Sequence, residues 1–232
     1  MATSYHRAVN GALLLWRRAE DEGWNAEDST LLADVAVQLG VAIQQIRNQL
    51  ELEALSRTDA LTGLLNRRAF TAELEMRLAR GDRSTAGSLF YVDLDNFKPV
   101  NDAHGHRKGD EALTTVAAML RDSTRPGDLV ARLGGDEFAL WLDRTDDRAA
   151  SQRARELLAR SHCLLPWSGD PARPLGISIG IAVWRSGLEG DFDELAARAD
   201  AAMYQAKQDG KNGFAVAPAP PADTVPRTRV PA

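Results

Sequence analysis

A glycine pair between two apolar runs constrains the fold of this chain more than any other stretch. Residues 129–142 are rich in β-forming side chains, and the glycine pair at 134–135 interrupts them. Because glycine adopts positive φ angles without a steric cost, this pattern predicts a tight β-hairpin. Asp136 and Glu137 follow the glycines, and neighbours on a strand point to opposite faces, so we expect the two carboxylates to have different roles. Taken alone, the stretch also fits an ordinary hairpin with a charged tip.

The composition limits the class of protein that can carry this hairpin. With 232 residues, 44% of them hydrophobic and 26% charged, the chain has room for one globular domain and an appendage. The net charge of −5 argues against a general nucleic-acid binder, although a few local cations can still hold a small anion. The single cysteine, Cys163, cannot form an internal disulfide, which fits a reducing compartment.

The N-terminus shows no targeting signal. Residues 1–10 lack the apolar core of a signal peptide. No apolar run approaches the roughly 18 residues that a membrane-spanning helix needs. We therefore expect a cytoplasmic protein without a membrane segment.

The first 56 residues contain too few elements to enclose a core. We expect a short buried strand over residues 11–16 and a helix over residues 30–50, capped by Asp28 or Ser29. The apolar positions of this helix are spaced by three and four residues: Leu32, Val35, Leu39, Ala42 and Ile46. Such a heptad seam is typical of a parallel dimer helix, or of an amphipathic helix that packs on its own domain. Residues 1–56 resemble the last strand and C-terminal helix of a GAF domain, leading into a helical stalk.

The rest of the chain interleaves helices and strands. Helices are predicted over residues 67–80, 109–121, 146–161 and 191–208, and strands over residues 89–95, 129–142 (the hairpin) and 175–183. A polar loop is expected over residues 81–88. This alternation predicts an α/β or α+β sheet domain. Five prolines after residue 217 predict a disordered tail over residues 217–232.

Two further carboxylates point to chemistry. Asp93 and Asp95 are two residues apart, so they share one face at the end of a predicted strand. Two ionised carboxylates need a counter-charge there, and a hard cation such as Mg²⁺ provides one. If the hairpin pairs with this strand, Asp136 can meet Asp93 and complete a site for a nucleotide triphosphate with its metal. The alternative is a pair of strand-end carboxylates held in salt bridges.

Seven motifs follow one another between residues 57 and 215. They are Asp59–Arg68, Asp93–Asp102, Gly105–His106, Gly109–Glu111, Arg132–Phe138, Ser178–Gly180 and Asp200–Asn212. In this order they resemble the GGDEF family, the diguanylate cyclases. The resemblance implies a domain over residues 57–216 with a central, mostly antiparallel sheet flanked by helices, similar to the nucleotidyl-cyclase and polymerase-palm core. It also implies the family's reaction, in which two GTP condense into cyclic di-GMP and two pyrophosphates leave.

The resemblance assigns roles to the acidic residues and to one lysine. Asp93 and Asp136 match the metal-binding carboxylates, with the backbone carbonyl of Leu94 as a further ligand, and the metal is Mg²⁺ or Mn²⁺. Asp136 also matches the residue that deprotonates the attacking 3′-hydroxyl. Glu137 matches the second acid, as a further metal ligand or as the proton acceptor. Lys98 matches a cation that stabilises the charge on the reacting phosphate.

Other positions match the family's substrate contacts. Asn101 and Asp110 match the residues that read guanine, since a carboxylate accepts hydrogen bonds from guanine that adenine cannot donate. Phe97 matches a residue that lines the substrate site, and His106 either lines that site or makes a structural hydrogen bond. Two more lysines match the phosphate contacts, Lys207 and Lys211.

A second site follows from the same resemblance. Arg125 and Asp128 have the spacing of the family's inhibitory Arg-x-x-Asp site, which binds the product cyclic di-GMP. The family often completes this site with an arginine on the next helix, where this chain has Glu156, with Arg153 and Arg155 close by. The alternative is an Arg/Asp turn before a strand.

Ring closure implies a homodimer, because one domain holds one GTP and two must face each other. The helix over residues 30–50 is suited to pairing the domains. Two other functions stay open at this point. One is a non-catalytic receptor that binds cyclic di-GMP at Arg125 and Asp128, and the other is a monomeric GTP-binding module.

Overall fold

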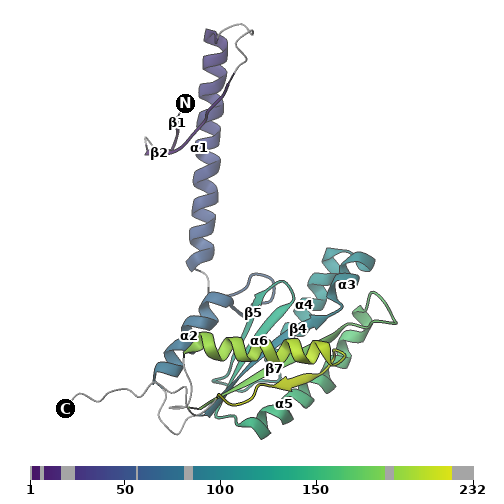
Figure 1. The fold of residues 1–232 in the computed structure, drawn as a ribbon. Coiled ribbons are helices and arrows are strands. Elements are labelled where there is room, and N and C mark those ends of the chain that lie inside the picture. The colour runs from purple at the N-terminus through teal and green to yellow at the C-terminus, as the bar shows by residue number, and fades with distance from the viewer. Residues whose placement is uncertain are drawn as a thin grey trace, which may run out of the picture. The chain divides into compact units, whose positions relative to one another are not determined.

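The chain divides into two compact units, residues 1–56 and residues 57–232. The computed structural model describes residues 2–5, 8–16, 24–55, 57–80, 86–185 and 191–220. Figure 1 shows both units, and each is considered by itself.

The first unit is a strand pair on a long helix. Strands β1 (Ala2–Tyr5) and β2 (Ala8–Ala12) are antiparallel and pack on helix α1 (Ala26–Leu55). The Asn10 side-chain amide donates to the Gly40 carbonyl oxygen at 2.7 Å, which ties β2 to the helix. The strand ends at Ala12, so the predicted buried strand over residues 11–16 is wrong beyond that point. Residues 14–16 are exposed.

Helix α1 begins earlier than predicted. The Asn25 side chain accepts from the Asp28 backbone N–H at 2.8 Å, and the Asp28 carboxylate accepts from the Asn25 backbone N–H at 3.1 Å. This reciprocal pair is a capping box, so Asn25 caps the helix and Asp28 is its third residue. The prediction of Asp28 or Ser29 as the cap was therefore wrong.

Helix α1 has a high mean hydropathy, although its sequence contains no long uninterrupted apolar run. By length and composition alone, residues 26–48 could cross a membrane, a criterion that the core helix of a soluble protein also meets. A single helix of this kind is weak evidence for a membrane span, so the expected absence of a membrane segment stays a prediction. Its polar residues interrupt every apolar run, but few of them are charged, so the mean hydropathy stays high.

A six-stranded sheet forms the centre of the second unit. Its strands are β3 (Leu65–Asn66), β4 (Ala86–Asp95), β5 (Leu129–Gly134), β6 (Glu137–Asp143), β7 (Gly176–Arg185) and β8 (Phe214–Val216). The spatial order is β3-β5-β6-β4-β7-β8, and only the two edge pairs are parallel. The predicted fold class, a mostly antiparallel sheet flanked by helices, is confirmed.

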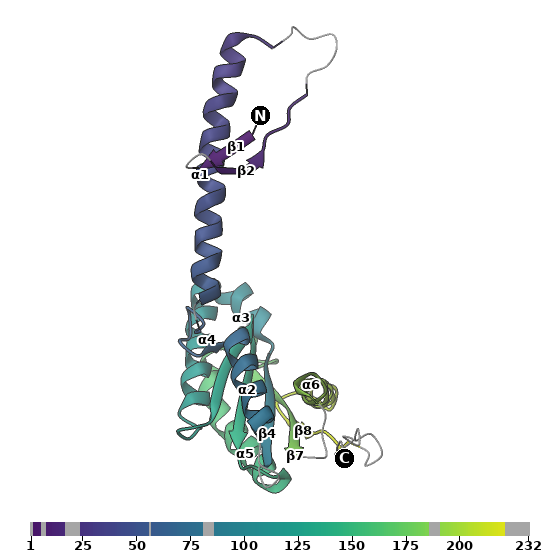
Figure 2. The ribbon, with the colours of Figure 1, turned by 90° about the vertical axis from the view of Figure 1, so that its left-hand side faces the viewer.

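Helices cover both faces of this sheet. They are α2 (Arg67–Arg80), α3 (Phe97–His104), α4 (His106–Arg121), α5 (Asp147–Arg160) and α6 (Phe192–Gln208), with a 3₁₀ helix over Ser161–Trp167. Helices α4 and α5 bury one apolar cluster against the sheet, and α2 and α6 bury a second one on the opposite face. Helix α6 crosses the sheet in Figure 1 and is seen end-on in Figure 2.

A glycine lets α6 approach the sheet closely. A Cβ atom at Gly180 on β7 would lie 2.1 Å from the Ala199 carbonyl oxygen and 2.2 Å from the Met203 backbone nitrogen. Only a residue without a side chain fits there, so Gly180 sets the depth at which α6 packs. The end of α6 carries Lys207 and leads to Lys211, two of the predicted site residues.

Several predicted boundaries differ from the structure. The long helix predicted from residue 109 is preceded by a further helix, α3, and begins at residue 106. Residues 81–85 of the predicted loop lie outside the described residues, and 86–88 belong to β4. Residues 221–232 of the predicted disordered tail also lie outside them. Ala217 is buried, and its backbone N–H donates to the Ile181 carbonyl oxygen at 2.7 Å.

Candidate functional site

The hairpin turn places Asp136 at an exposed corner of the sheet. Gly134 pairs with Glu137 across the ladder, so Gly135 and Asp136 are the two turn residues. Gly134 and Gly135 have φ angles of 144° and 53°, which glycine adopts without strain. The prediction of a tight Gly-Gly hairpin therefore holds, but Asp136 lies in the turn itself rather than on the strand after it. Glu137 is the first residue of β6.

Strand β4 brings Asp93 to the same corner. Asp93 pairs with Glu137 across the ladder, and the Leu94 backbone N–H donates to the Asp136 carbonyl oxygen at 3.2 Å. Asp93 lies beside Lys207, whose Nζ is 2.8 Å from the Asp93 carboxylate. Burial raises the pKa of Asp93 above its usual value, and the neighbouring Asp136 adds to this, while Lys207 acts in the opposite direction.

Asp95 has a structural role. Its carboxylate is buried and accepts two kinds of hydrogen bond, from the Ser178 hydroxyl at 2.9 and 2.8 Å and from the Asn212 backbone N–H at 2.8 Å. It joins β4 to β7 and to the loop after α6. The two strand-end carboxylates therefore differ, since the partly buried Asp93 pairs with a lysine and Asp95 is fully buried and hydrogen-bonded inside the protein.

The corner supplies oxygen donors of the kind that hard cations prefer. They are the carboxylates of Asp93 and Asp136 and the backbone carbonyl of Leu94. The Asp136 carboxylate makes no hydrogen bond or ion pair with any residue that the structure describes. Among these residues no three acidic, histidine or cysteine side chains form a metal-binding cluster. Mg²⁺ typically takes one or two carboxylates and fills its shell with water and phosphate, so this donor set fits it.

Two of the three predicted lysines contact residues at the end of β4. Lys211 adopts a left-handed conformation, with φ at 65°, and its Nζ lies 3.1 Å from the Asn96 side-chain oxygen just after β4. Lys207 and Lys211 thus both reach the end of β4. Lys98 lies on α3 and is exposed.

Helices α3 and α4 hold the predicted base-reading residues. A Cβ atom at Gly109 would lie 2.0 Å from Asn101 Oδ1 and 3.2 Å from the Phe97 ring, so this glycine lets the two helices meet at those side chains. Asp110 follows Gly109 and is exposed, and His106 is exposed at the start of α4. The structure thus brings Asn101 and Phe97 together and leaves Asp110 and His106 accessible beside them.

Arg132 stabilises the hairpin turn, and the sequence analysis assigned this residue no role of its own. Arg132 donates from Nε and Nη2 to the Gly135 carbonyl oxygen, at 3.0 and 2.8 Å, and from Nη1 to the Asp59 carboxylate at 3.2 Å. Burial acts to raise the pKa of Asp59, but hydrogen bonds from Thr62 and the Arg132 charge outweigh it and hold that pKa below its usual value. Both partners lie in recognisable motifs, but they are too far apart in sequence for spacing to reveal the contact.

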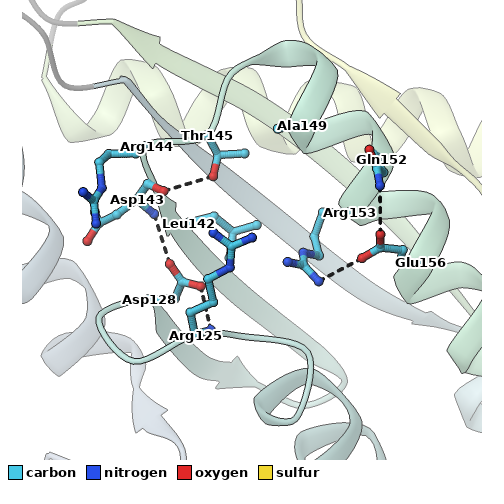
Figure 3. A pocket seen from close by; sticks show the side chains of 10 residues that line it. All are labelled: Arg125, Asp128, Leu142, Asp143, Arg144, Thr145, Ala149, Gln152, Arg153 and Glu156. Carbon is cyan, nitrogen blue, oxygen red and sulfur yellow. Dashed lines mark hydrogen bonds and ion pairs between the residues drawn. The ribbon is translucent and has the colours of Figure 1, made fainter.

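Arg125 and Asp128 line a separate cavity of about 200 Å³, between the loop before β5 and helix α5 (Figure 3). The Asp128 carboxylate accepts from the backbone N–H groups of Arg125 and Asp143, at 2.9 and 3.2 Å. The guanidinium of Arg125 has no ion-pair partner among the described residues. Across the cavity, Arg153 forms an ion pair with Glu156 at 2.8 Å.

The sequence matches known families and proteins. The profile described as "Diguanylate cyclase, GGDEF domain" matches residues 56–213. Diguanylate cyclase DgcM of Escherichia coli (strain K12) is 42% identical over 170 residues, which cover 73% of this chain and 40% of that protein. Cyclic di-GMP phosphodiesterase PdeR of the same organism is 36% identical over 175 residues, 75% of this chain and 26% of that protein. The chain thus spans less than half the length of either relative.

A solved structure is similar as well. It is the coiled coil and GGDEF domain of DgcB from Caulobacter crescentus in complex with cyclic di-GMP. Its TM-score against this chain is 0.63 at 29% sequence identity, and the match covers 82% of this chain and 98% of that chain.

Proposed function

The chain belongs to the GGDEF family, and we propose that it is a diguanylate cyclase that condenses two GTP into one cyclic di-GMP and releases two pyrophosphates. One observation carries this proposal. Strand β4 and the hairpin turn bring the carboxylate-bearing residues Asp93 and Asp136 to one corner of the sheet, with Lys207 beside Asp93.

A divalent cation, Mg²⁺ or Mn²⁺, is proposed to bind Asp93, Asp136 and the Leu94 carbonyl. When bound, it would neutralise phosphate charge and lower the pKa of the attacking hydroxyl. Asp136, whose carboxylate is free of protein partners among the described residues, can accept the proton from the 3′-hydroxyl. Glu137 on the neighbouring strand is the second acid, as a ligand or as an alternative acceptor.

Positive charge near the corner supports a triphosphate substrate. We assign phosphate binding to Lys98, Lys207 and Lys211. Lys207 forms an ion pair with Asp93 in the structure. When metal and substrate bind, Asp93 would contact the metal and Lys207 would contact a phosphate, and these two contacts would replace the ion pair. Lys211 is a lysine and not an arginine, so it offers phosphate a compact ammonium charge and not the bidentate hydrogen bonds of a guanidinium.

Guanine recognition is assigned to residues on α3 and α4, where the two helices meet at Gly109. Asn101 and Asp110 supply an amide and a carboxylate, which suit the N1–H and 2-amino group of guanine. Phe97 and His106 are assigned to its lining. This choice of groups favours GTP over ATP.

A homodimer is proposed because ring closure needs two facing nucleotides. The predicted seam of α1 is available for pairing in this chain, since Val35, Leu39 and Ile46 are exposed. The similar DgcB structure contains a coiled coil with its GGDEF domain. A membrane is the other apolar partner that α1 could have, and a solution size measurement without detergent separates the two.

Product inhibition is assigned to the cavity at Arg125 and Asp128. An unpaired guanidinium inside a cavity suits a phosphate or a guanine edge. This cavity also supports the second candidate function, a non-catalytic receptor for cyclic di-GMP.

The remaining assignments concern the chain as a whole. We propose that residues 57–216 are the cyclase domain, that residues 1–56 are the end of a GAF-like domain with its stalk, and that the reaction takes place in the cytoplasm.

The test is product analysis. Purified protein is incubated with GTP and Mg²⁺, and the products are separated by chromatography, with Asp136→Ala alongside. Cyclic di-GMP from the wild type alone supports the cyclase. A dimer that binds cyclic di-GMP and leaves GTP intact supports the receptor instead.

A further inference from the structure

Arg67 lies beside the turn of the β5–β6 hairpin. It is the first residue of α2 and follows the short edge strand β3. Strand β3 runs parallel to β5, with Leu65 opposite Ala131 and Asn66 opposite Arg132. The side chain of Asn66 accepts from the Ala69 backbone N–H at 2.9 Å, which fixes the start of the helix. Arg67 is therefore held beside the last residues of β5.

The Arg67 guanidinium contacts both arms of the hairpin. Its Nε donates to the Leu133 carbonyl oxygen at 3.0 Å, and its Nη2 donates to the Glu137 carboxylate at 3.1 Å. Leu133 is the second-last residue of β5 and Glu137 is the first residue of β6. One planar group thus spans the turn that carries Asp136, a geometry that a guanidinium provides and an ammonium does not.

The solvent exposure of the Arg67–Glu137 ion pair limits its contribution to the stability of the protein. The side chains of Arg67 and Glu137 are 59% and 46% exposed. Exposed ion pairs contribute little to the free energy of folding, because water screens both charges. A large contribution of Arg67 to overall stability is therefore not expected, and its effect has to be sought in geometry.

The Glu137 side chain borders a cavity, so its conformation depends on its contact with Arg67. A cavity of about 400 Å³ borders Arg67 and Glu137, together with Tyr91 and Asp200. A carboxylate next to open space has several rotamers available unless a partner selects one. Arg67 is the residue that selects the rotamer of Glu137.

We infer that Arg67 is a positioning residue, which holds Glu137 and the turn bearing Asp136 in the arrangement that the reaction needs. The inference rests on the proposed cyclase activity. Arg132 donates a hydrogen bond to the Gly135 carbonyl oxygen, whereas Arg67 donates to the Leu133 carbonyl oxygen and the Glu137 carboxylate. Two arginines therefore hold the turn at different points. Arg67 itself contacts neither substrate nor metal in this account.

The experiment measures steady-state cyclic di-GMP formation and thermal unfolding for Arg67→Ala and Arg67→Lys. For Arg67→Ala we expect kcat to fall by about 10- to 100-fold, the range expected for a misplaced catalytic group, with KM for GTP little changed. Arg67→Lys can reach Glu137 but cannot also hold Leu133, so its kcat should lie between those of the wild type and Arg67→Ala. Neither variant should change the melting temperature appreciably.

A matched control removes another exposed ion pair. Arg173 lies 3.0 Å from Asp170, with its side chain 68% exposed, in a loop away from the hairpin, and Arg173→Ala should keep the wild-type kcat. The inference is overturned if Arg67→Ala keeps the wild-type kcat, if Arg67→Lys is no better than Arg67→Ala, or if the loss of kcat follows a loss of thermal stability. A wild-type protein that makes no cyclic di-GMP would instead overturn the proposed function, so the two failures are distinguishable.

Discussion

The acidic residues near the candidate site form two pairs that are close in sequence, Asp93 with Asp95 and Asp136 with Glu137, and the members of each pair have unlike environments. Asp93 faces Lys207, and Asp95 is buried among hydrogen-bond donors. Glu137 is held by Arg67, while the Asp136 carboxylate is free of partners within the described part of the chain. A metal ion gains most from a carboxylate that gives up no protein partner on binding. This difference favours Asp136 as the acid that works directly on metal and substrate.

Glu156 is predicted to weaken product binding at the cavity of Figure 3. Its carboxylate pairs with Arg153 and adds a negative charge where the phosphates of cyclic di-GMP would lie. Glu156→Ala should therefore tighten cyclic di-GMP binding by roughly two- to fivefold, the worth of an exposed ion pair. Calorimetric titration of the purified protein measures it.

The matched control for that change is Glu75→Ala, which removes an exposed carboxylate on α2, outside the cavity. It should leave the dissociation constant unchanged. An equal change in both variants would mean that net charge, rather than the Arg153 contact, sets the affinity.

Asp59 gives a pH-dependent contribution to stability. Its folded-state pKa is held below the usual value, so the stabilisation is present above the unfolded pKa of 3.8 and is lost as the pH falls through the folded value. Asp59→Asn should lower the free energy of unfolding at pH 7 by roughly 1.5–3 kcal/mol, the worth of hydrogen bonds to a charged group. The difference should shrink below pH 3.8.

Denaturant titrations at several pH values measure this effect. Asp102→Asn, which changes an exposed carboxylate on α3, is the control and should show no such loss at pH 7. A stability difference between Asp59→Asn and the wild type that is independent of pH would contradict the assigned charge interaction.

Among the elements, those with a clear hydrophobic period were predictable and the short ones were not. The buried strand β4 and helix α6 were placed from their apolar patterns, and the hairpin from its glycines. Helix α3 was missed because it has only eight residues and contains Pro99. Strand β3 has two residues and β8 three, too few for any pattern.

The candidate site follows the same division. Motif residues at strand ends, such as Asp93, could be named from the sequence because their spacing carries the information. The contacts of Asp59 with Arg132 and of Arg67 with Glu137 could not, since each joins residues about 70 positions apart through the sheet. The spacing of residues along one strand or helix shows which of them share a face. Which faces of different elements come into contact is known only from the fold.

Gly180 tests how the packing of α6 positions the site. Gly180→Ala would push a methyl group into the backbone of α6, displacing the helix and Lys207 from Asp93. We expect a loss of about 1–3 kcal/mol in the free energy of unfolding, typical of overpacking, together with weaker GTP turnover. Gly213→Ala is the control, because its nearest contact would be an ordinary 3.5 Å from the Lys211 carbonyl oxygen. Equal melting temperatures for the two variants would contradict the close-packing argument.

At the scale of the whole molecule, the proposed reaction requires that two cyclase domains come together. The heptad spacing of α1 and the exposure of its seam fit a paired helix. A pairing of this kind transmits its register along the helix, so a shift of register should change how the two active sites face each other.

Insertions in α1 test that dependence. Four extra residues after Gln49 interrupt the heptad, whereas seven extra residues preserve it. We expect the four-residue insertion to change the specific activity strongly and the seven-residue insertion to retain more of it, with sedimentation measuring the dimer in both. Equal activities would count against control by helix register.

Phosphorus NMR of GTP turnover tests whether the Asp93–Asp136 corner joins two GTP molecules. We expect two pyrophosphates for each cyclic di-GMP, turnover that stops when EDTA removes the divalent cation, and no turnover by Asp136→Asn. Release of inorganic phosphate with GDP, or turnover that persists in Asp136→Asn, would contradict it.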